Sequence, residues 1–325
     1  MTLFPTQNDG SRDFTEIVYE KTGPVATVMI NRPAHYNAYN TQALKELIQA
    51  FTDAAWDDSI SVVVYTGAGD KAFCTGGDVK EYQAYYTKRP RDYYKYMGLF
   101  RAYIESIINL GKPSIARLNG MAVGGGNESQ MACDLAVMAD DTFLGQIGTN
   151  VGSVACGGAT QWLPIMVGDR RAREMLLLNQ RIPAQQALDW GLVNRVVPRE
   201  KLDEAVDELV QQLLDKFFEC TRYTRTQVNF WKELAWHQTI GHARDWLTTH
   251  FACGEPNEGM RAFVEKRKVD YRGLRRKMAE GGSIEFLWGS YSVVCPACGA
   301  YGLPSEFAYC GQCGHELSAD ADAKT

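Results

Sequence analysis

The sequence lacks the features of several large classes of protein. It has no excess of positive charge, because 34 lysines and arginines face 39 aspartates and glutamates, for a formal net charge of -5. Such a chain has no basic surplus to neutralise a phosphate backbone. It also lacks an apolar run approaching the ~20 residues that cross a bilayer, and its first 13 residues contain no apolar signal segment. We expect a cytoplasmic protein that binds neither nucleic acid nor a membrane.

Histidine is scarce and cysteine is unevenly placed. The five histidines are scattered, which gives no sign of a histidine-based catalytic cluster. The nine cysteines do not form a disulfide framework, because four of them crowd into residues 295–313. A length of 325 residues with 45% hydrophobic side chains leaves room for one large catalytic domain and a smaller unit.

Strand and helix signals alternate through the first half of the chain. Strands are predicted at residues 16–21, 25–31, 61–66, 114–118 and 135–139, and helices at 42–56, 90–108 and 124–134. Thr41 is predicted to cap the first of these helices. Helical patterns dominate from about residue 168 to 264, and a Gly-Gly-Ser run at 281–283 marks a boundary. The predicted division is therefore a core over residues 14–200, a helical segment over 201–280 and a small module over 290–316.

Two glycine-rich segments each follow a predicted strand. The first spans residues 73–78, and the second spans residues 119–128 and leads into a helix. Glycine allows close backbone approach and leaves N–H groups free. A pair of such N–H groups, one of them at a helix N-terminus, binds a developing oxyanion. A lone glycine-rich turn is more often structural, but two of them with these flanking residues favour a catalytic role.

With these loops, the chain resembles the enoyl-CoA hydratase/isomerase (crotonase) superfamily over roughly residues 15–272. The motifs that carry the resemblance are Asn31-Arg32-Pro33 with Asn37-Ala38, residues 71–78, residues 119–126, Phe143 with Gly145-Gln146, residues 184–193 and residues 258–267. The resemblance implies an α/β fold, a ClpP-like ββα spiral followed by a helical C-terminal segment. It further implies a homo-oligomer, a trimer or a dimer of trimers held by residues 201–280, and a coenzyme A thioester substrate.

The resemblance also implies which residues form the site. Gly77 and Gly125 would donate their backbone N–H groups to the thioester oxygen while an enolate forms. The residues that correspond to the family's CoA-binding positions are Asn37, Ala38, Asp78, Lys80 and Lys266. The physical argument agrees, because preorganised donors aimed at a developing oxyanion are typically worth ~3–4 kcal/mol each.

One of the two carboxylates of the superfamily's hydratases is missing. Those enzymes hold a catalytic water between two glutamates, and Glu128 stands at the first of the two positions. Gly148 occupies the second. Because addition of water needs a base and an acid at matched places, this pattern argues against simple hydration. The group that would replace the second glutamate is not identified by the sequence.

A glycine at this position, with Gly-Ser at 152–153, resembles two subgroups of the superfamily. One is the 1,4-dihydroxy-2-naphthoyl-CoA synthases, which usually lack a glutamate where Glu128 sits and carry an aspartate near Ser153. The other is the hydrolases that open alicyclic rings, and in particular those acting on 6-oxocyclohex-1-ene-1-carbonyl-CoA. The runs that resemble the latter are residues 66–77, 80–82, 157–160 and 163–168. The ring-opening hydrolases are therefore the favoured relatives.

The predicted reaction is hydrolysis of a ring C–C bond in an alicyclic β-oxoacyl-CoA. Glu128 would activate the water, and Glu128 or a phenol would return a proton to the α-carbon. Tyrosines are dense between residues 82 and 96, and Tyr82 and Tyr86 are the predicted phenols. Cys74 is expected to have a packing role. Two alternatives stay open, namely an enoyl-CoA or dienoyl-CoA hydratase/isomerase and a non-catalytic acyl-CoA-binding scaffold.

The C-terminal cysteines form two CxxC pairs. They are Cys295 with Cys298 and Cys310 with Cys313, and a glycine follows each pair. Four thiolates with this spacing suit one tetrahedral ion, so the module resembles a zinc ribbon, with iron as a lesser alternative. Four protein ligands leave no open position for catalysis, so we expect a structural Zn²⁺ that supplies most of the folding energy of the module. A lid near the CoA entrance, a subunit contact and a partner-binding surface all remain open as its role.

Overall fold

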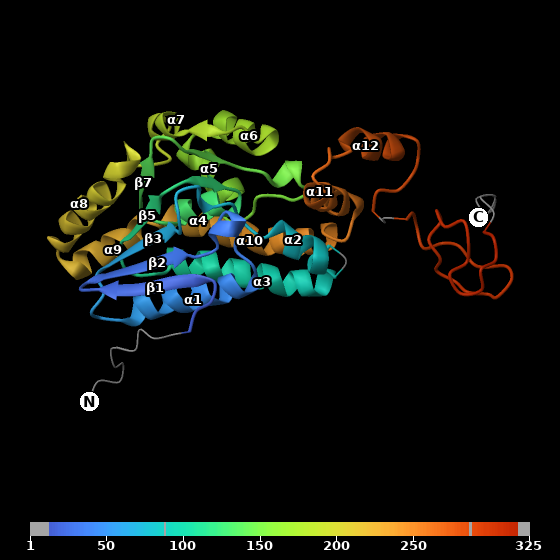
Figure 1. Cartoon of the computed structure of the whole chain (residues 1–325), viewed down its shortest axis with the longest axis horizontal. Coiled ribbons are helices and arrows are strands. Elements are labelled where there is room, and N and C mark those ends of the chain that lie inside the picture. The colour runs from blue at the N-terminus through green and yellow to red at the C-terminus, as the bar shows by residue number, and fades with distance from the viewer. Residues whose placement is uncertain (1–12, 88, 286–287, 318–325) are drawn as a thin grey trace.

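Two β-sheets form the centre of the computed structural model, which describes residues 13–87, 89–285 and 288–317 (Figure 1). The first sheet has the order β1 (Ile17–Thr22), β2 (Val25–Ile30), β3 (Val62–Gly67), β5 (Ser114–Leu118), β7 (Leu135–Ala139) and β10 (Arg195–Val197). The second has the order β4 (Ala72–Cys74), β6 (Met121–Val123), β8 (Phe143–Gly145) and β9 (Ile182–Pro183). The predicted strands of residues 16–139 thus lie in the first sheet.

The strands alternate between the two sheets as the chain advances. β1 and β2 pair antiparallel, whereas β2, β3, β5, β7 and β10 are parallel neighbours. Each of the pairs β3–β4, β5–β6 and β7–β8 gives one strand to each sheet before a helical segment begins. Parallel strands need such crossovers, because a tight turn cannot join them. The result is the ββα spiral that the sequence predicted.

Helices cover both faces of the first sheet. They are α1 (Thr41–Trp56), α2 (Val79–Glu81), α3 (Pro90–Ile108), α4 (Gly125–Ala132), α5 (Ala159–Met166), α6 (Asp169–Leu178), α7 (Ala184–Asp189), α8 (Leu202–Leu214), α9 (Phe218–Val228), α10 (Phe230–His250), α11 (Gly254–Glu265) and α12 (Tyr271–Ala279). Short helical turns lie at Pro33–His35, Tyr82–Tyr86, Gly148–Asn150 and Arg199–Lys201. Strand β3 shows the layering, since Val63 and Tyr65 join the core with α1 and α3 while Val62 and Val64 contact the cluster of α8. Within the described ranges, no helix has both the length and the apolar character to cross a bilayer.

The start of α1 differs from the prediction. Asn40, not Thr41, is the N-cap, because its side-chain Oδ1 accepts a hydrogen bond of 2.7 Å from the Ala43 N–H. The Thr41 hydroxyl instead lies 2.5 Å from the Tyr86 hydroxyl. The prediction for Thr41 was wrong because both residues are good caps, and only the path of the chain selects between them.

Two buried cations join the C-terminal helices to the core. The Arg225 guanidinium donates to Asp134 Oδ2 at 2.7 Å and to the carbonyls of Ile107 and Ile108 at the end of α3. The Lys232 ammonium donates to the carbonyls of Met131 at 2.7 Å and Cys133 at 3.1 Å, at the end of α4. Cations are favoured at helix C-termini, where carbonyls lack intrahelical partners. Lys232 therefore holds the far end of α4, the helix that begins at Gly125.

The C-terminal module follows α12 and lies away from the two sheets in Figure 1. Its residues 288–317 contain isolated bridges, Val293 with Leu303 and Tyr309 with Glu316, and a small cluster around Cys295, Cys310 and Leu317. The Lys277 ammonium on α12 pairs with the Glu306 carboxylate of the module. With so little apolar core, the module needs another source of stability.

Candidate active site

A cavity of about 680 Å³ opens between the two glycine-rich loops. Its lining includes the loop of residues 75–78, the loop of residues 123–125, Glu128, residues 145–148 and side chains of α3 and α11. Aromatic and aliphatic side chains dominate, among them Tyr39, Tyr82, Tyr93, Tyr96, Met97, Phe100, Val151 and Met260. Such a surface suits a bulky apolar acyl group.

The two loops that carry the predicted N–H donors are in contact. A Cβ built on Gly76 would lie 2.9 Å from the Gly125 nitrogen, so the two loops touch. Gly76 has a φ of 88° and Gly124 a φ of 56°, which are left-handed values that favour glycine. These turns bring Gly77 and Gly125 together in one wall of the cavity.

The N–H of Gly77 is turned away from its neighbouring strand. The Tyr39 N–H donates to the Gly76 carbonyl at 2.9 Å, and the Asp78 N–H donates to the Tyr39 carbonyl at 2.9 Å. Because successive backbone groups of an extended segment point to opposite sides, the Gly77 N–H points the other way. Gly125 is the first residue of α4, and the first N–H groups of a helix have no intrahelical partner. Both donors are thus available to a ligand oxygen, as an oxyanion hole requires.

Neither of these glycines tolerates a side chain. A Cβ on Gly77 would lie 1.6 Å from the Tyr82 hydroxyl oxygen, and a Cβ on Gly125 would lie 1.8 Å from the Tyr39 hydroxyl oxygen. A phenol therefore lies against each predicted donor residue. Tyr82 was a predicted site residue, whereas Tyr39 was missed. The signal that could have found Tyr39 was its place directly after the Asn37-Ala38 motif.

Glu128 lies beside this pair of donors, inside the cavity. Its side chain is buried, and its Oε1 accepts hydrogen bonds from the Gly157 N–H at 2.6 Å and the Ala159 N–H at 3.2 Å. Burial raises the pKa of the Glu128 carboxyl to about 7, although the two amides act in the opposite direction. A carboxyl with a pKa near neutrality can both accept and return a proton at physiological pH.

The chain packs tightly around Gly148, which occupies the position of the second hydratase glutamate. A Cβ built on Gly148 would lie 3.0 Å from the Ser153 carbonyl oxygen and 3.2 Å from the Ala155 nitrogen. The Ser153 N–H also donates to the Gly148 carbonyl at 2.8 Å, which folds residues 148–153 into a tight loop. A longer side chain at residue 148 would require this loop to move. The tight packing of this loop is a structural reason for glycine at residue 148.

Among the described lining residues, the other carboxylate besides Glu128 is that of Asp78. Asp78 Oδ1 caps α2 by accepting from the Lys80 N–H at 3.0 Å, and its Oδ2 lies 3.1 Å from Arg32 Nη2. Both oxygens are therefore engaged in holding the first loop. Glu128 is left as the carboxyl suited to proton transfer.

The remaining residues predicted to contact CoA divide into two groups. Ala38, Lys80 and Lys266 line the cavity, and both lysines are exposed. Asn37 does not, because its buried amide donates to the Ala68 and Ala72 carbonyls at 2.9 Å and 2.7 Å. Its position supports a role in shaping the loop. Arg181, which the sequence analysis missed, also lines the cavity and stacks over Phe143 at 4.7 Å.

The tyrosine cluster separates into cavity-facing and supporting residues. Tyr82 lines the cavity, and its hydroxyl lies 2.6 Å from that of Tyr96. Tyr86 does not belong to the lining, and its hydroxyl contacts Thr41 instead. This position argues against the catalytic role predicted for Tyr86. Cys74 is fully buried, and burial raises the pKa of its thiol to about 12, which agrees with the expected packing role.

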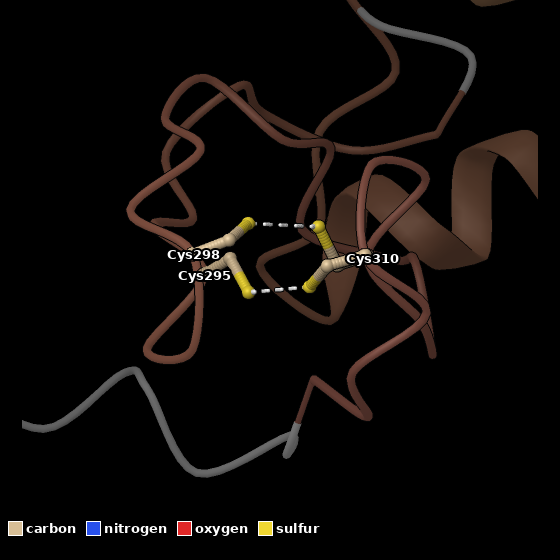
Figure 2. A group of neighbouring side chains, drawn as sticks. Cys295, Cys298 and Cys310 are labelled. Carbon is tan, nitrogen blue, oxygen red and sulfur yellow. Dashed lines mark hydrogen bonds between the residues drawn. The ribbon is translucent and has the colours of Figure 1, made fainter.

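The four C-terminal cysteines converge on one point. Their sulfur atoms all lie within 4.8 Å of one another, with Cys295 to Cys313 at 3.6 Å and Cys298 to Cys310 at 3.8 Å. Figure 2 shows Cys295 and Cys298 on one loop facing Cys310 on the other. Sulfur atoms about 2.3 Å from a tetrahedral zinc ion are spaced at about these separations, whereas a disulfide is far shorter. The cluster therefore fits a metal ion, and it lies outside the cavity lining.

Comparisons with known proteins agree with this geometry. The model of the enoyl-CoA hydratase/isomerase family matches residues 20–275. A 6-oxocyclohex-1-ene-1-carbonyl-CoA hydrolase of Geobacter metallireducens is 34% identical, over 79% of this chain and 81% of the relative. One of Thauera aromatica is 32% identical, over 78% of this chain and 82% of the relative.

Solved structures show the same fold. An enoyl-CoA hydratase from Mycobacterium avium subsp. paratuberculosis K-10 is 25% identical with a TM-score of 0.72, covering 79% of this chain and 98% of that chain. An enoyl-CoA hydratase/isomerase from Xanthobacter autotrophicus Py2 is 26% identical with a TM-score of 0.71, covering 82% and 97%. The family match spans the spiral, both glycine-rich loops and the helices behind them. The chain belongs to the enoyl-CoA hydratase/isomerase (crotonase) family and has a crotonase fold.

Proposed function

We propose that this protein hydrolyses a ring C–C bond of an alicyclic β-oxoacyl-CoA. The observation that carries the proposal is the Glu128 carboxyl in the cavity beside Gly77 and Gly125, with a tightly packed glycine at 148 where a second carboxylate would stand. The names of the two relatives at 34% and 32% identity support the same reaction class. The aromatic lining of the cavity suits a ring better than a linear chain.

The mechanism that fits this site is a hydrolytic retro-Claisen cleavage. Glu128 takes a proton from water while the water oxygen attacks the ring ketone carbon, giving a tetrahedral alkoxide. The bond from this carbon to the α-carbon then breaks, and its electron pair becomes the thioester enolate, held by the Gly77 and Gly125 N–H groups. The proton on Glu128 passes to the α-carbon, with Tyr82 as the other donor in reach of the loop. The products are a carboxylic acid and the intact CoA thioester on one open chain.

The test uses 2-oxocyclohexane-1-carbonyl-CoA and mass spectrometry of the product. This ring has no alkene to hydrate, so gain of one water with CoA still attached identifies ring opening. Hydration of crotonyl-CoA in a parallel reaction, with the ring compound unchanged, would instead favour the enoyl-CoA or dienoyl-CoA hydratase. A non-catalytic acyl-CoA-binding scaffold would turn over neither compound while still binding CoA.

The exposed cations at the cavity are proposed to bind the CoA phosphates. Lys80, Arg181 and Lys266 line the cavity, are exposed, and have no ion-pair partner among the described residues. Cations facing a phosphate form charge-assisted hydrogen bonds. Replacement of Lys266 by alanine should raise KM several-fold and leave kcat nearly unchanged, because the contact is made equally before and during reaction.

We also propose a structural Zn²⁺ on the four C-terminal cysteines and a cytoplasmic homo-oligomer, a trimer or a dimer of trimers. Along α9 and α10, exposed apolar side chains favour a subunit contact; they are Tyr223, Val228, Phe230 and Leu234. Light scattering of the purified protein measures the mass of the assembly directly. A monomer at micromolar concentration would contradict the proposed oligomer.

A further inference from the structure

Tyr39 links the two oxyanion loops. Its backbone pairs with the first loop, through the Gly76 carbonyl and the Asp78 N–H, each at 2.9 Å. Its side chain reaches the second loop, where the hydroxyl oxygen lies 1.8 Å from the place of a Cβ on Gly125. The phenol therefore lies directly beside one of the two backbone donors. It also lies near enough to Glu128 for the charge of that carboxylate to raise the pKa of the phenol.

The Tyr39 hydroxyl belongs to a cavity-lining residue and has no hydrogen-bond partner among the described residues. The residue as a whole is only 2% exposed. A hydroxyl that lines a cavity and has no partner in the protein is available to donate to a ligand atom. The ring has little freedom to turn away, since it stacks with Phe100 at 5.9 Å and lies against Tyr103 at 5.7 Å.

We propose that the Tyr39 hydroxyl donates a hydrogen bond to the ring ketone oxygen of a β-oxoacyl thioester. The inference rests on the proposed function and names the second carbonyl that the site recognises. In such a substrate one carbon separates the two carbonyls, so their oxygens can lie side by side. With the thioester oxygen at Gly77 and Gly125, the neighbouring ketone oxygen then comes beside Gly125, where the phenol lies. The alkoxide formed by water attack develops on that oxygen, where a preorganised donor lowers the barrier.

Other phenols of the cavity are less suited to this role. The Tyr82 hydroxyl is already bonded to that of Tyr96 at 2.6 Å. Burial raises the pKa of Tyr39 well above its ordinary value, so the phenol stays protonated and remains a donor across the physiological range. Tyr39 thus has the free donor, the position and the protonation state that the ketone oxygen requires.

The experiment measures binding in a Glu128→Gln background, which prevents turnover. Two ligands are compared by calorimetry: 2-oxocyclohexane-1-carbonyl-CoA, and cyclohexane-1-carbonyl-CoA, which lacks the ketone. Adding Tyr39→Phe should weaken the ketone ligand about tenfold and leave the other ligand unchanged. Tyr103→Phe is the matched control, because Tyr103 is a buried neighbour that bonds Tyr65 and does not line the cavity. It should affect the two ligands equally.

An equal loss for both ligands in Tyr39→Phe, or no loss for either, would overturn the assignment. The infrared stretch of a carbon-13 ketone in the bound ligand gives a second reading that needs no change at Tyr39. A shift to lower frequency on binding supports a donor at that oxygen, and an unshifted band contradicts it. If the native enzyme opens the ring but the ketone preference survives Tyr39→Phe, this inference alone fails. If the native enzyme does not open the ring, the proposed function fails first.

Discussion

Glu128 combines full burial with two amide hydrogen bonds to one oxygen, and this combination sets its chemistry. Burial raises the pKa of the carboxyl from an ordinary value of 4.5 to about 7. The hydrogen bonds from Gly157 and Ala159 fix the orientation of Oε1 without cancelling that effect. Oε2 has no hydrogen-bond donor among the described residues, and it is the oxygen left for a water molecule.

Glu128→Gln should abolish ring opening while CoA binding persists. Glutamine preserves the shape of the side chain but can no longer take a proton from water, so a loss of about 10²–10⁴ in kcat is expected. Stopped assays give kcat, and calorimetry with CoA gives the binding constant. In the proposed mechanism the ionised carboxyl of the native protein is the base, so kcat/KM should rise with an apparent pKa of about 7. Unaltered turnover in the variant would remove Glu128 from the mechanism.

The same carboxyl should reduce stability at high pH. Its native pKa lies above its unfolded value, so the folded state binds the extra proton and stability falls as pH rises from about 4.5 to about 7. Glu128→Gln has no carboxyl to titrate at this position. The unfolding free energy of the variant, relative to that of the native protein, should therefore rise by roughly 2 kcal/mol between pH 5 and pH 8. Urea unfolding at the two pH values measures the difference. An advantage that is the same at both values would show that the carboxyl titrates normally.

At the scale of the element, α4 carries two of the proposed catalytic residues at one end and is held at the other. Gly125 starts the helix, Glu128 lies on its first turn, and Lys232 binds the carbonyls at its C-terminal end. Burial lowers the pKa of the Lys232 ammonium, which shows the cost of placing a cation there. Two hydrogen bonds to the Met131 and Cys133 carbonyls, which would otherwise lack partners at the end of the helix, offset this cost.

Lys232→Met should destabilise the fold by about 1–3 kcal/mol, because the Met131 and Cys133 carbonyls lose their donor while the volume of the side chain is kept. Urea unfolding measures the change. Lys216→Met is the matched control, since Lys216 is exposed and has no ion-pair partner among the described residues. Equal stabilities of the two variants would show that Lys232 does not support α4.

The parts of the site that follow from short motifs could be predicted, and the parts made by long-range packing could not. Gly77, Gly125 and Glu128 belong to runs whose resemblance to the crotonase superfamily implies an oxyanion hole and a base. Tyr39 reaches Gly125 across the fold, and Lys232 reaches α4 from a helix a hundred residues later. Such contacts depend on how segments far apart in the sequence pack against one another in the folded chain. Tyr86 was predicted to be a catalytic phenol, but the π-helical turn at Tyr82–Tyr86 directs its hydroxyl toward Thr41 and not into the cavity.

At the scale of the whole molecule, two units of very different construction share one chain. The spiral is stabilised by a large apolar core, whereas residues 288–317 have a cluster of a few apolar side chains around Cys295, Cys310 and Leu317. Metal binding would therefore supply most of the free energy that folds the module. The family resemblance implied the spiral, but the sequence pattern predicted only strands of the first sheet and missed the short strands β4, β6, β8 and β9 of the second. The position of the module outside the cavity lining could not be predicted either.

One zinc ion per chain is expected by elemental analysis, and a strong chelator should unfold the module alone. Limited proteolysis should then cut within residues 288–317, while the thermal midpoint of the core stays constant. Cys298→Ser should reproduce the effect, because it removes one of four ligands. Cys220→Ser is the control, since Cys220 is exposed and belongs to no cluster among the described residues. A chelated protein with an intact module would contradict a structural metal.

The contact between the Tyr39 hydroxyl and Gly125 makes the two positions interdependent. Alanine at 125 is excluded while a hydroxyl oxygen lies 1.8 Å from its Cβ, and Tyr39→Phe removes that atom. Gly125→Ala should therefore cost less stability in a Tyr39→Phe background than in the native chain, by an interaction energy of roughly 1 kcal/mol. Over evolutionary time such a pair would change together, so a glycine at 125 and a tyrosine at 39 form a joint signature by which further members of this subgroup could be recognised.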